Sequence, residues 1–144
     1  MNLLIDSNVV LDFLLERQPF FNDAQKVFEL RANPNNQLYV SAAAITDIYY
    51  IAYRTLHSHD AVINLIESLL NIVEISTVQS AHIHNAVNLH WKDFEDAVQY
   101  SVAKFNGLNG IVTRNMKGFK ESDVKIFTPE EILDFLNSQE DNHK

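Results

Sequence analysis

The sequence predicts an α/β protein, a three-layer α/β/α sandwich with a central parallel sheet of four to five short strands. Short apolar runs rich in β-forming residues alternate along the chain with longer segments of helical periodicity. Only three glycines and three prolines interrupt the 144 residues, so helices should dominate between the strands. There is no internal repeat, and the length suits one domain that buries its own core.

The first strand is expected over residues 2–6, and the helix after it should end near Pro19. The inward residues of that helix are Val9, Val10, Phe13 and Leu14. A second helix, over residues 21–32, has an apolar stripe at the i, i+3, i+4, i+7 spacing, made of Phe21, Ala24, Val27, Phe28 and the stem of Arg31. A turn at residues 33–36 leads into a second strand at residues 37–41.

Four more helices and three more strands are expected before the last helix. The helices fall at residues 42–56, 59–71, 77–91 and 93–106, and the strands at residues 72–76, 110–114 and 124–128. The last helix opens with "TPEEILDFL", in which Thr128 caps, Pro129 takes the first helical position and Glu131 completes a capping box. Residues 1–136 are therefore expected to form the domain, and residues 137–144 a flexible C-terminal tail.

Composition limits the classes of function that are open to this chain. Hydrophobic residues make up 47%, and no apolar run approaches the roughly 18–20 residues of a membrane span. The absence of cysteine excludes disulfides and thiolate metal sites, and a cytoplasmic location is the default expectation. A net charge of −8 argues against a general nucleic-acid coat protein, which would show a basic face. It does not exclude a nuclease, because an active site built from carboxylates is itself acidic.

Two carboxylates stand where the apolar pattern does not explain them. Asp6 follows the first strand, at the edge of a parallel sheet where ligands bind. Asp47 lies in "AAAITDIYYIAY", a helix that is apolar on nearly all sides and should be largely buried. A buried carboxylate must be paired, hydrogen-bonded or metal-bound. The alternative for Asp47 is a narrow solvent-exposed stripe, or an ion pair with Arg54.

A third acidic group opens the helix at residues 93–106. In "KDFEDAVQYSVAKF", Asp93, Asp96 and Tyr100 fall on one flank of the inward stripe, and Glu95 falls on the other. Asp93 is also a good N-cap, which would explain it without any catalytic role. Asp96 then lies near the helix N-terminus, where the helix dipole helps to keep a carboxylate ionised.

Together these acids predict a cation site. Carboxylates brought to one edge of the sheet suit Mg²⁺ or Mn²⁺, which prefer oxygen ligands and keep several waters. The strand at residues 110–114 leads into "VTRN", and a basic cluster follows, made of Arg114, Lys117, Lys120 and Lys125. A carboxylate-held metal beside a basic loop indicates phosphodiester hydrolysis.

Four segments resemble, in order and spacing, the motifs of PIN-domain ribonucleases, a family that includes toxins of bacterial toxin–antitoxin pairs. They are "LLIDSNVVLDFLL", "SAAAITDIYYIA", "DFEDAVQYSVA" and "IVTRNMKGF", and the resemblance spans residues 2–127. It implies an α/β/α fold and an endoribonuclease in which Asp6, Asp47 and Asp96 hold Mg²⁺ or Mn²⁺, with Asp93 as a helper. Thr113 would position water or metal through its hydroxyl.

The chain departs from the family pattern at two positions. Asp47 stands where the family usually has Glu, so its contact with the metal would run through water. Asn115 stands at the usual fourth acidic position and supplies an amide instead of a charge, which favours one metal over two. The substrate-binding residues expected around these acids are Ser7, Asn8, Thr113, Arg114, Lys117 and Lys120.

Two other classes of function stay open. One is a catalytically weak or inactive module that binds RNA or protein, which Asn115 and the net charge favour. The other is a receiver-like phosphoacceptor domain, which normally has an acidic pair after the first strand, whereas Asp6 stands there alone. The partners expected under the leading interpretation are an RNA substrate, an antitoxin protein and a second copy of the chain, with no membrane involvement.

Overall fold

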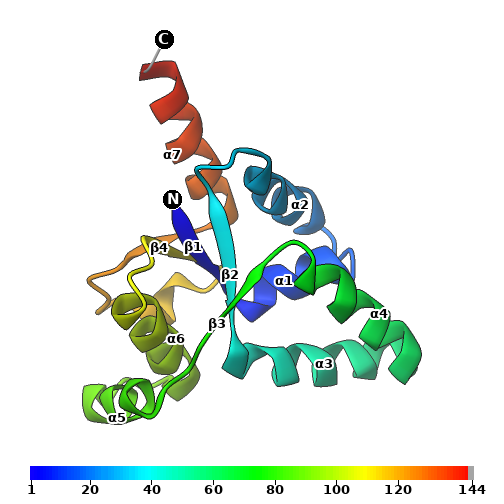
Figure 1. The fold of residues 1–144 in the computed structure, drawn as a ribbon, viewed down its shortest axis with the longest axis horizontal. Coiled ribbons are helices and arrows are strands. Elements are labelled where there is room, and N and C mark those ends of the chain that lie inside the picture. The colour runs from blue at the N-terminus through cyan, green and yellow to red at the C-terminus, as the bar shows by residue number, and fades with distance from the viewer. Residues whose placement is uncertain (143–144) are drawn as a thin grey trace.

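The structure is a computed structural model that describes residues 1–142, with side chains through residue 140. A five-stranded sheet in the order β3-β2-β1-β4-β5 lies at its centre, and every neighbouring pair of strands is parallel (Figure 1). The strands are β1 Asn2–Ile5, β2 Gln37–Ser41, β3 Glu74–Ser76, β4 Gly110–Val112 and β5 Lys125–Phe127. The predicted α/β/α sandwich with a parallel sheet is therefore confirmed.

Seven α-helices and two 3₁₀ helices connect these strands in the described part of the chain. They are α1 Ser7–Leu14, α2 Phe21–Glu29, η1 Leu30–Ala32, α3 Ala42–Leu56, α4 His59–Leu70, α5 Ser80–Leu89, α6 Phe94–Phe105, η2 Met116–Phe119 and α7 Pro129–Asn142. Helices α1 to α4 and α7 pack on one face of the sheet, and α5 and α6 pack on the other (Figure 1).

The two faces of strand β1 build two separate cores. Leu3 and Ile5 point into the larger core, which α1, α2, α3, α4 and α7 cover. Leu4 points the other way, into a smaller core with Tyr100 of α6 and Phe119 of η2. This alternation follows from the period of two in a strand. Because helices cover both faces of the sheet, Leu3, Leu4 and Ile5 are all buried. Strand β1 is thereby held rigidly on both sides up to the residue where it ends.

Helix α3 has the predicted bounds but not the predicted burial. Ser41 caps it through its side chain, and it ends at His57, which has a left-handed backbone conformation. The expectation that it is buried on nearly all sides is wrong. Only Ala44, Ile48 and Ala52 are buried, because α1 and α4 cover a single face of the helix.

The structure also differs from expectation at Arg31 and at the end of α7. Arg31 is exposed, so its stem does not join the apolar stripe of α2. Helix α7 runs on to Asn142 instead of ending at residue 136, since no glycine or proline stops it. The rest of the expected tail, residues 143–144, lies outside the described residues. No helix in residues 1–142 is both long enough and apolar enough to cross a membrane.

Candidate active site

Asp6 lies at the carboxyl end of β1, the central strand, between β2 and β4. The chain adds strands on one side of β1 first and on the other side later, so Asp6 marks the switch point of the sheet. Its carboxylate is 6% exposed. One oxygen accepts hydrogen bonds from the Ser7 backbone N–H at 2.7 Å and from Gln99 Nε2 at 2.5 Å. The other accepts from Thr113 Oγ1 at 2.7 Å.

Thr113 holds Asp6 in place. It is fully buried, and its hydroxyl oxygen also accepts from the Asn115 backbone N–H at 3.0 Å. Asn8 bridges the same two elements, because its Nδ2 lies 3.4 Å from Thr113 Oγ1 and 3.5 Å from Asp6 Oδ2. The Thr113 hydroxyl is therefore occupied in orienting the Asp6 carboxylate.

Asp96 and Asp93 lie at the start of α6. Asp93 is the N-cap, as predicted, and accepts a hydrogen bond from the Asp96 backbone N–H at 3.0 Å. The Asp96 side chain is buried, with 6% exposed. Burial raises the pKa of Asp96 to about 7, helped by the negative charges of Asp93, Asp6 and Glu95. Every one of these effects acts in the same direction, so the Asp96 carboxyl group lies among like charges.

Glu95 and Asp47 belong to the same electrostatic cluster. Burial raises the pKa of Glu95, and the charges of Asp47 and Asp6 raise it further. The sequence periodicity separates Glu95 from Asp96, yet both acids sense the charge of Asp6. Asp47 is exposed, so the expectation of a buried carboxylate in α3 is wrong and the solvent-facing alternative holds.

Gln99 contacts the candidate site, although the sequence did not single it out. It lies one turn after Asp96 on α6, it is 2% exposed, and it donates to Asp6. The i, i+3 spacing from Asp96 places both side chains on the same side of the helix. That spacing was the available signal, but Gln99 reads as an ordinary polar helix residue.

Unpartnered polar atoms gather around these acids. Three buried side-chain atoms have no hydrogen-bond partner among the described residues, and they are Ser7 Oγ, Asp96 Oδ2 and Gln99 Oε1. Buried polar atoms are nearly always satisfied, so three such atoms beside Asp6 indicate that a polar ligand or water occupies this place. All three are oxygens, which suits a hard cation.

The site fits a hydrated cation better than a closed cage of side chains. Within residues 1–142, no three His, Cys, Asp or Glu side chains converge on a single coordination point. Mg²⁺ commonly binds through one or two carboxylates and keeps several of its waters. Asp6 and Asp96 supply two such carboxylates, and the outer acids Asp93, Glu95 and Asp47 add negative charge around them.

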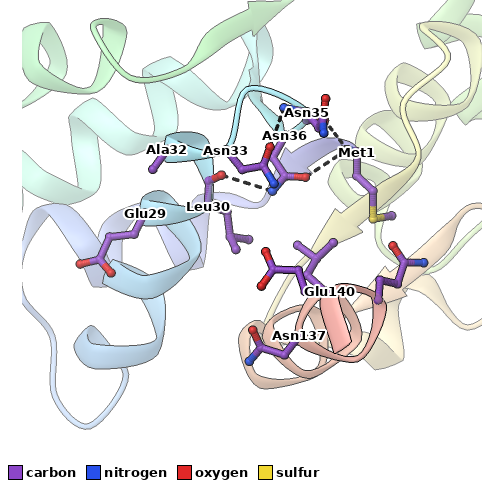
Figure 2. A pocket seen from close by; sticks show the side chains of 11 residues that line it. Met1, Glu29, Leu30, Ala32, Asn33, Asn35, Asn36, Asn137 and Glu140 are labelled. Atoms are coloured by element: carbon purple, nitrogen blue, oxygen red, sulfur yellow. Dashed lines mark hydrogen bonds between the residues drawn. The ribbon is translucent and has the colours of Figure 1, made fainter. Parts of the chain in front are cut away.

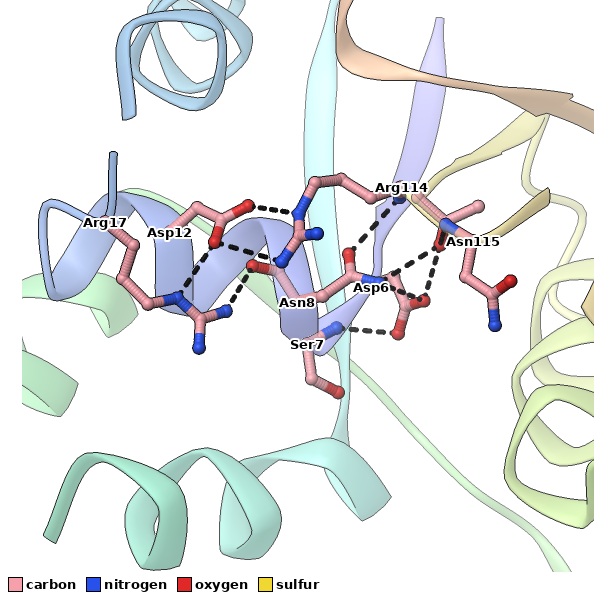
Figure 3. Close-up of polar contacts among 8 residues, drawn as sticks. Asp6, Ser7, Asn8, Asp12, Arg17, Arg114 and Asn115 are labelled. Atoms are coloured by element: carbon pink, nitrogen blue, oxygen red, sulfur yellow. Dashed lines mark hydrogen bonds and ion pairs between the residues drawn. The ribbon is translucent and has the colours of Figure 1, made fainter. Parts of the chain in front are cut away.

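Arg114 makes contacts within the chain, and its predicted contact with a substrate stays a prediction. Its Nε donates to Asp12 Oδ2 at 2.6 Å, and its guanidinium lies 3.8 Å from the centre of the Phe20 ring. Asp12 is only 1% exposed and also pairs with Arg17 at 2.9 Å (Figure 3). The Arg114 guanidinium thus ties the loop after β4 to α1, although Arg114 is itself exposed, as are Lys117 and Lys120.

Ser7 and Asn8, which the sequence predicts to bind substrate, both lie beside Asp6. The Ser7 hydroxyl is buried and unpartnered beside Asp6. The Asn8 amide is shared among Asp6, Thr113 and the Arg114 backbone N–H, which donates to Asn8 Oδ1 at 3.4 Å. Asn115 is exposed, and its Nδ2 lies near Gly118 at the rim of the acidic site. Contact of these side chains with a substrate stays a prediction.

A separate cavity of about 420 Å³ lies at the other end of the strands (Figure 2). Met1, the loop at residues 33–36 and helix α7 line it. The N-terminal amino group donates to the Asn35 backbone oxygen at 2.6 Å and to Asn36 Oδ1 at 3.1 Å. None of the acids around Asp6 lines this cavity, so it is distinct from the candidate active site.

Comparison with known proteins gives one family. Residues 2–117 match the family model described as PIN domain. A similar curated protein is Ribonuclease VapC1 from Aquifex aeolicus (strain VF5), which is 26% identical over 141 residues, covering 94% of this chain and 96% of that protein.

Solved structures share the fold at lower identity. VapBC-1 from nontypeable Haemophilus influenzae aligns with a TM-score of 0.67 and 19% identity, over 90% of this chain and 99% of that one. A toxin–antitoxin complex from Klebsiella pneumoniae aligns with a TM-score of 0.66 and 22% identity, over 88% and 96% of the two chains. At these identities the likeness supports the fold.

Proposed function

The chain belongs to the PIN domain family, and from this premise we propose that it is a metal-dependent endoribonuclease acting as the toxin of a toxin–antitoxin pair. The acidic site at the switch point of the sheet carries the proposal. Unpartnered buried oxygens and mutually repelling carboxylates meet there, which is the environment that a divalent cation would stabilise. The similar Ribonuclease VapC1 supports the assignment of RNA as the substrate.

In this proposal Asp6 and Asp96 bind one Mg²⁺ or Mn²⁺, and Asp93 and Asp47 contact its hydration shell. A bound divalent cation supplies Lewis-acid polarisation of a phosphodiester and of a water. Thr113, Gln99 and the Ser7 backbone hold the Asp6 carboxylate in one orientation by three hydrogen bonds. The Asn115 amide contacts the attacking water or the phosphate from the rim of the site.

The partners proposed are an antitoxin protein and a second copy of the chain. The structural neighbours include a VapBC structure and a toxin–antitoxin complex, which supports the antitoxin. Support for a homodimer comes from the uncovered side of α3, where Tyr50 is 61%, Tyr53 41% and Leu56 40% exposed. Large apolar groups gathered on one helix face are typical of protein interfaces.

Thermal unfolding during a Mn²⁺ titration tests the metal site without knowledge of the RNA. A ligand that binds only the folded state adds about 2.7 kcal/mol of stability at a hundredfold excess over its dissociation constant. We expect Mn²⁺ to stabilise the parent saturably. Asp96→Asn should lose this stabilisation, and Asp23→Asn should be stabilised as much as the parent. Asp23 is a suitable control because it is an exposed acid on α2, outside the acidic site.

Cleavage of single-stranded RNA in Mn²⁺ then tests the reaction, with Asp6→Asn and Asp23→Asn compared at equal concentration. Cleavage that is lost in Asp6→Asn and retained in Asp23→Asn supports the proposal. The alternative is a non-catalytic binding module, which is favoured by the net charge and by Asn115 at the usual fourth acidic position. A parent that Mn²⁺ does not stabilise, and that binds RNA without cutting it, would establish this alternative.

A further inference from the structure

A second cavity, of about 510 Å³, lies beside the acidic site. Two segments that are distant in sequence form its walls, namely the corner between α5 and α6 and the segment around η2. Its volume falls within the range of roughly 300–1,000 Å³ that small ligands occupy in proteins. A single nucleotide is within that size.

The cavity adjoins the acids directly. Asp93, the N-cap of α6, lines it, and so does Gly118 of η2. A side-chain carbon placed on Gly118 would lie 1.8 Å from Asp96 Oδ2, so the Asp96 carboxylate is in contact with the cavity wall. A ligand in this cavity is therefore a neighbour of whatever the carboxylates bind.

Trp91 provides an aromatic surface in the cavity. It packs at its inner side on Tyr100, with ring centres 4.8 Å apart, and against Phe119 at 6.4 Å with perpendicular planes. Both partners are buried, whereas Trp91 is half-buried and lines the cavity. A rigidly supported indole with an open part is a suitable surface for stacking a nucleobase.

The charge of the cavity is opposite to that of the molecule. Lys92, Lys117 and Lys120 line it together with two acids, Asp93 and Glu121, which leaves one net positive charge. The whole chain carries −8. In the described residues, none of these three lysines takes part in an ion pair. Unpaired lysines around an aromatic ring are the combination that binds single-stranded nucleic acid.

We propose that this cavity binds one nucleotide of a single-stranded RNA next to the acidic site, with its base on Trp91 and its backbone phosphate on Lys117 and Lys120. The choice of RNA rests on the proposed ribonuclease function, whereas the binding geometry rests on the cavity alone. The base must leave any duplex to reach the indole, because a paired and stacked base cannot enter a cavity of this size. The site thus selects unpaired RNA.

Trp91 is the only tryptophan, so its fluorescence reports on this cavity. We would titrate a short single-stranded RNA into the full chain at about 0.1 M salt. EDTA is added to remove divalent cations, so that no metal-dependent cleavage occurs. Saturable quenching is expected with the single strand and not with a duplex of the same sequence. Adenosine monophosphate and inorganic phosphate, titrated separately, distinguish base stacking from phosphate binding alone.

A double variant, Lys117→Gln with Lys120→Gln, measures the phosphate contacts. Each contact to a single strand contributes about 0.7 to the slope of log K against log salt. Loss of two contacts lowers the slope by about 1.4, which is roughly 25-fold in affinity at 0.1 M salt. Lys26→Gln is the matched control, because Lys26 is an exposed lysine on α2 and does not line this cavity.

Fluorescence anisotropy of labelled RNA, measured in parallel, makes every outcome decisive. RNA that binds without quenching Trp91, quenching by inorganic phosphate to the same degree as by RNA, or a double variant that binds like Lys26→Gln would each overturn the proposal. Quenching that depends on the two lysines in a chain that does not cleave RNA would support the cavity and refute the proposed ribonuclease function. The two proposals can therefore fail independently.

Discussion

Asp96 combines burial, proximity to other acids and an unpartnered oxygen in a single residue. Its backbone N–H donates to the N-cap Asp93, and its carboxyl group lies against Gly118. Asp6, by contrast, accepts three hydrogen bonds of 2.7 Å or less. The two carboxylates of the site are therefore not equivalent, because Asp6 is fixed by the protein and Asp96 is stabilised by a proton or a cation.

The first prediction concerns stability against pH in EDTA. The pKa of Asp96 rises from its ordinary value near 3.8 to about 7 on folding, so the folded state binds more protons between these values. The stabilisation by protonated Asp96 is complete below about pH 4 and is lost as the pH rises to about 7, at about 1.4 kcal/mol per pKa unit. Relative to the parent, Asp96→Asn should gain stability over this range and level off above it.

Urea unfolding of both proteins at a series of pH values checks this prediction. Asp23→Asn serves as the control and should run parallel to the parent. A constant difference between the parent and Asp96→Asn at all pH values would show that the Asp96 carboxyl group titrates normally.

The second prediction concerns Gly118. An alanine Cβ at this position would lie 1.8 Å from Asp96 Oδ2 and 2.9 Å from its carboxyl carbon, so the Asp96 carboxylate must move. We expect Gly118→Ala to lower stability by about 1–3 kcal/mol, as overpacking does. The same substitution should cost much less when Asp96 is already alanine. A double-mutant cycle by chemical unfolding measures this coupling, and additive effects would contradict the contact.

At the scale of elements, the loop after β4 is joined to α1 by ion pairs. Arg114 and Arg17 both bind Asp12, whose side chain is almost fully buried in α1. The same loop carries Thr113, the hydroxyl donor to Asp6. The orientation of the Asp6 carboxylate therefore depends on a contact between segments 102 residues apart.

The third prediction is that Arg114→Ala destabilises the protein by about 1.5–3 kcal/mol, the typical contribution of a hydrogen bond to a charged group. Asp12 is buried and loses one of its two arginine partners, although Arg114 is itself partly exposed and Arg17 still pairs with Asp12. Lys117→Ala, in the same segment but without an ion pair among the described residues, should change stability by less than about 0.5 kcal/mol. Chemical unfolding of both variants checks the difference. Equal effects would mean that the Asp12 pair contributes little.

The elements differ in how well the sequence predicted them. The helix at residues 42–56 was predicted with its observed bounds from its apolar pattern alone, and the structure shows that Ser41 caps it and that it ends at His57. Its exposed face was not predicted, since tyrosines suit a core and an interface equally. The ion pair of Arg114 was also not predicted, because its partner Asp12 is set by tertiary packing and not by local sequence.

At the scale of the whole molecule, the acids that the sequence singled out share one electrostatic cluster, as parallel strand order requires. Asp6, Asp47, Asp93 and Asp96 come from three separate segments, and their charges act on one another or on Glu95. Strand alternation and sheet edges made this predictable. Gln99 and the Trp91 cavity were not predictable, because their importance arises only from which groups surround them in the fold.

The fourth prediction concerns the oligomeric state. If the exposed face of α3 is the homodimer interface, light scattering should give twice the chain mass of 16.5 kDa. The pair of substitutions Tyr50→Glu and Tyr53→Glu should then return the protein to a monomer, because charges on an apolar interface oppose association. Val87→Glu, at an equally exposed apolar position on α5, is the control. A monomeric parent would exclude this interface.

The order of the strands also determines when the site can form during synthesis. Strand β1 leaves the ribosome first, yet its neighbour β4 and the hydroxyl donor Thr113 are made more than a hundred residues later. A nascent chain thus carries the Asp6 carboxylate long before Gln99 and Thr113, two of the three groups that orient it, have been made. Long-range pairing of this kind also slows folding. For a protein proposed to cut RNA, the active conformation would be reached only after strand β4 and Thr113 have been made.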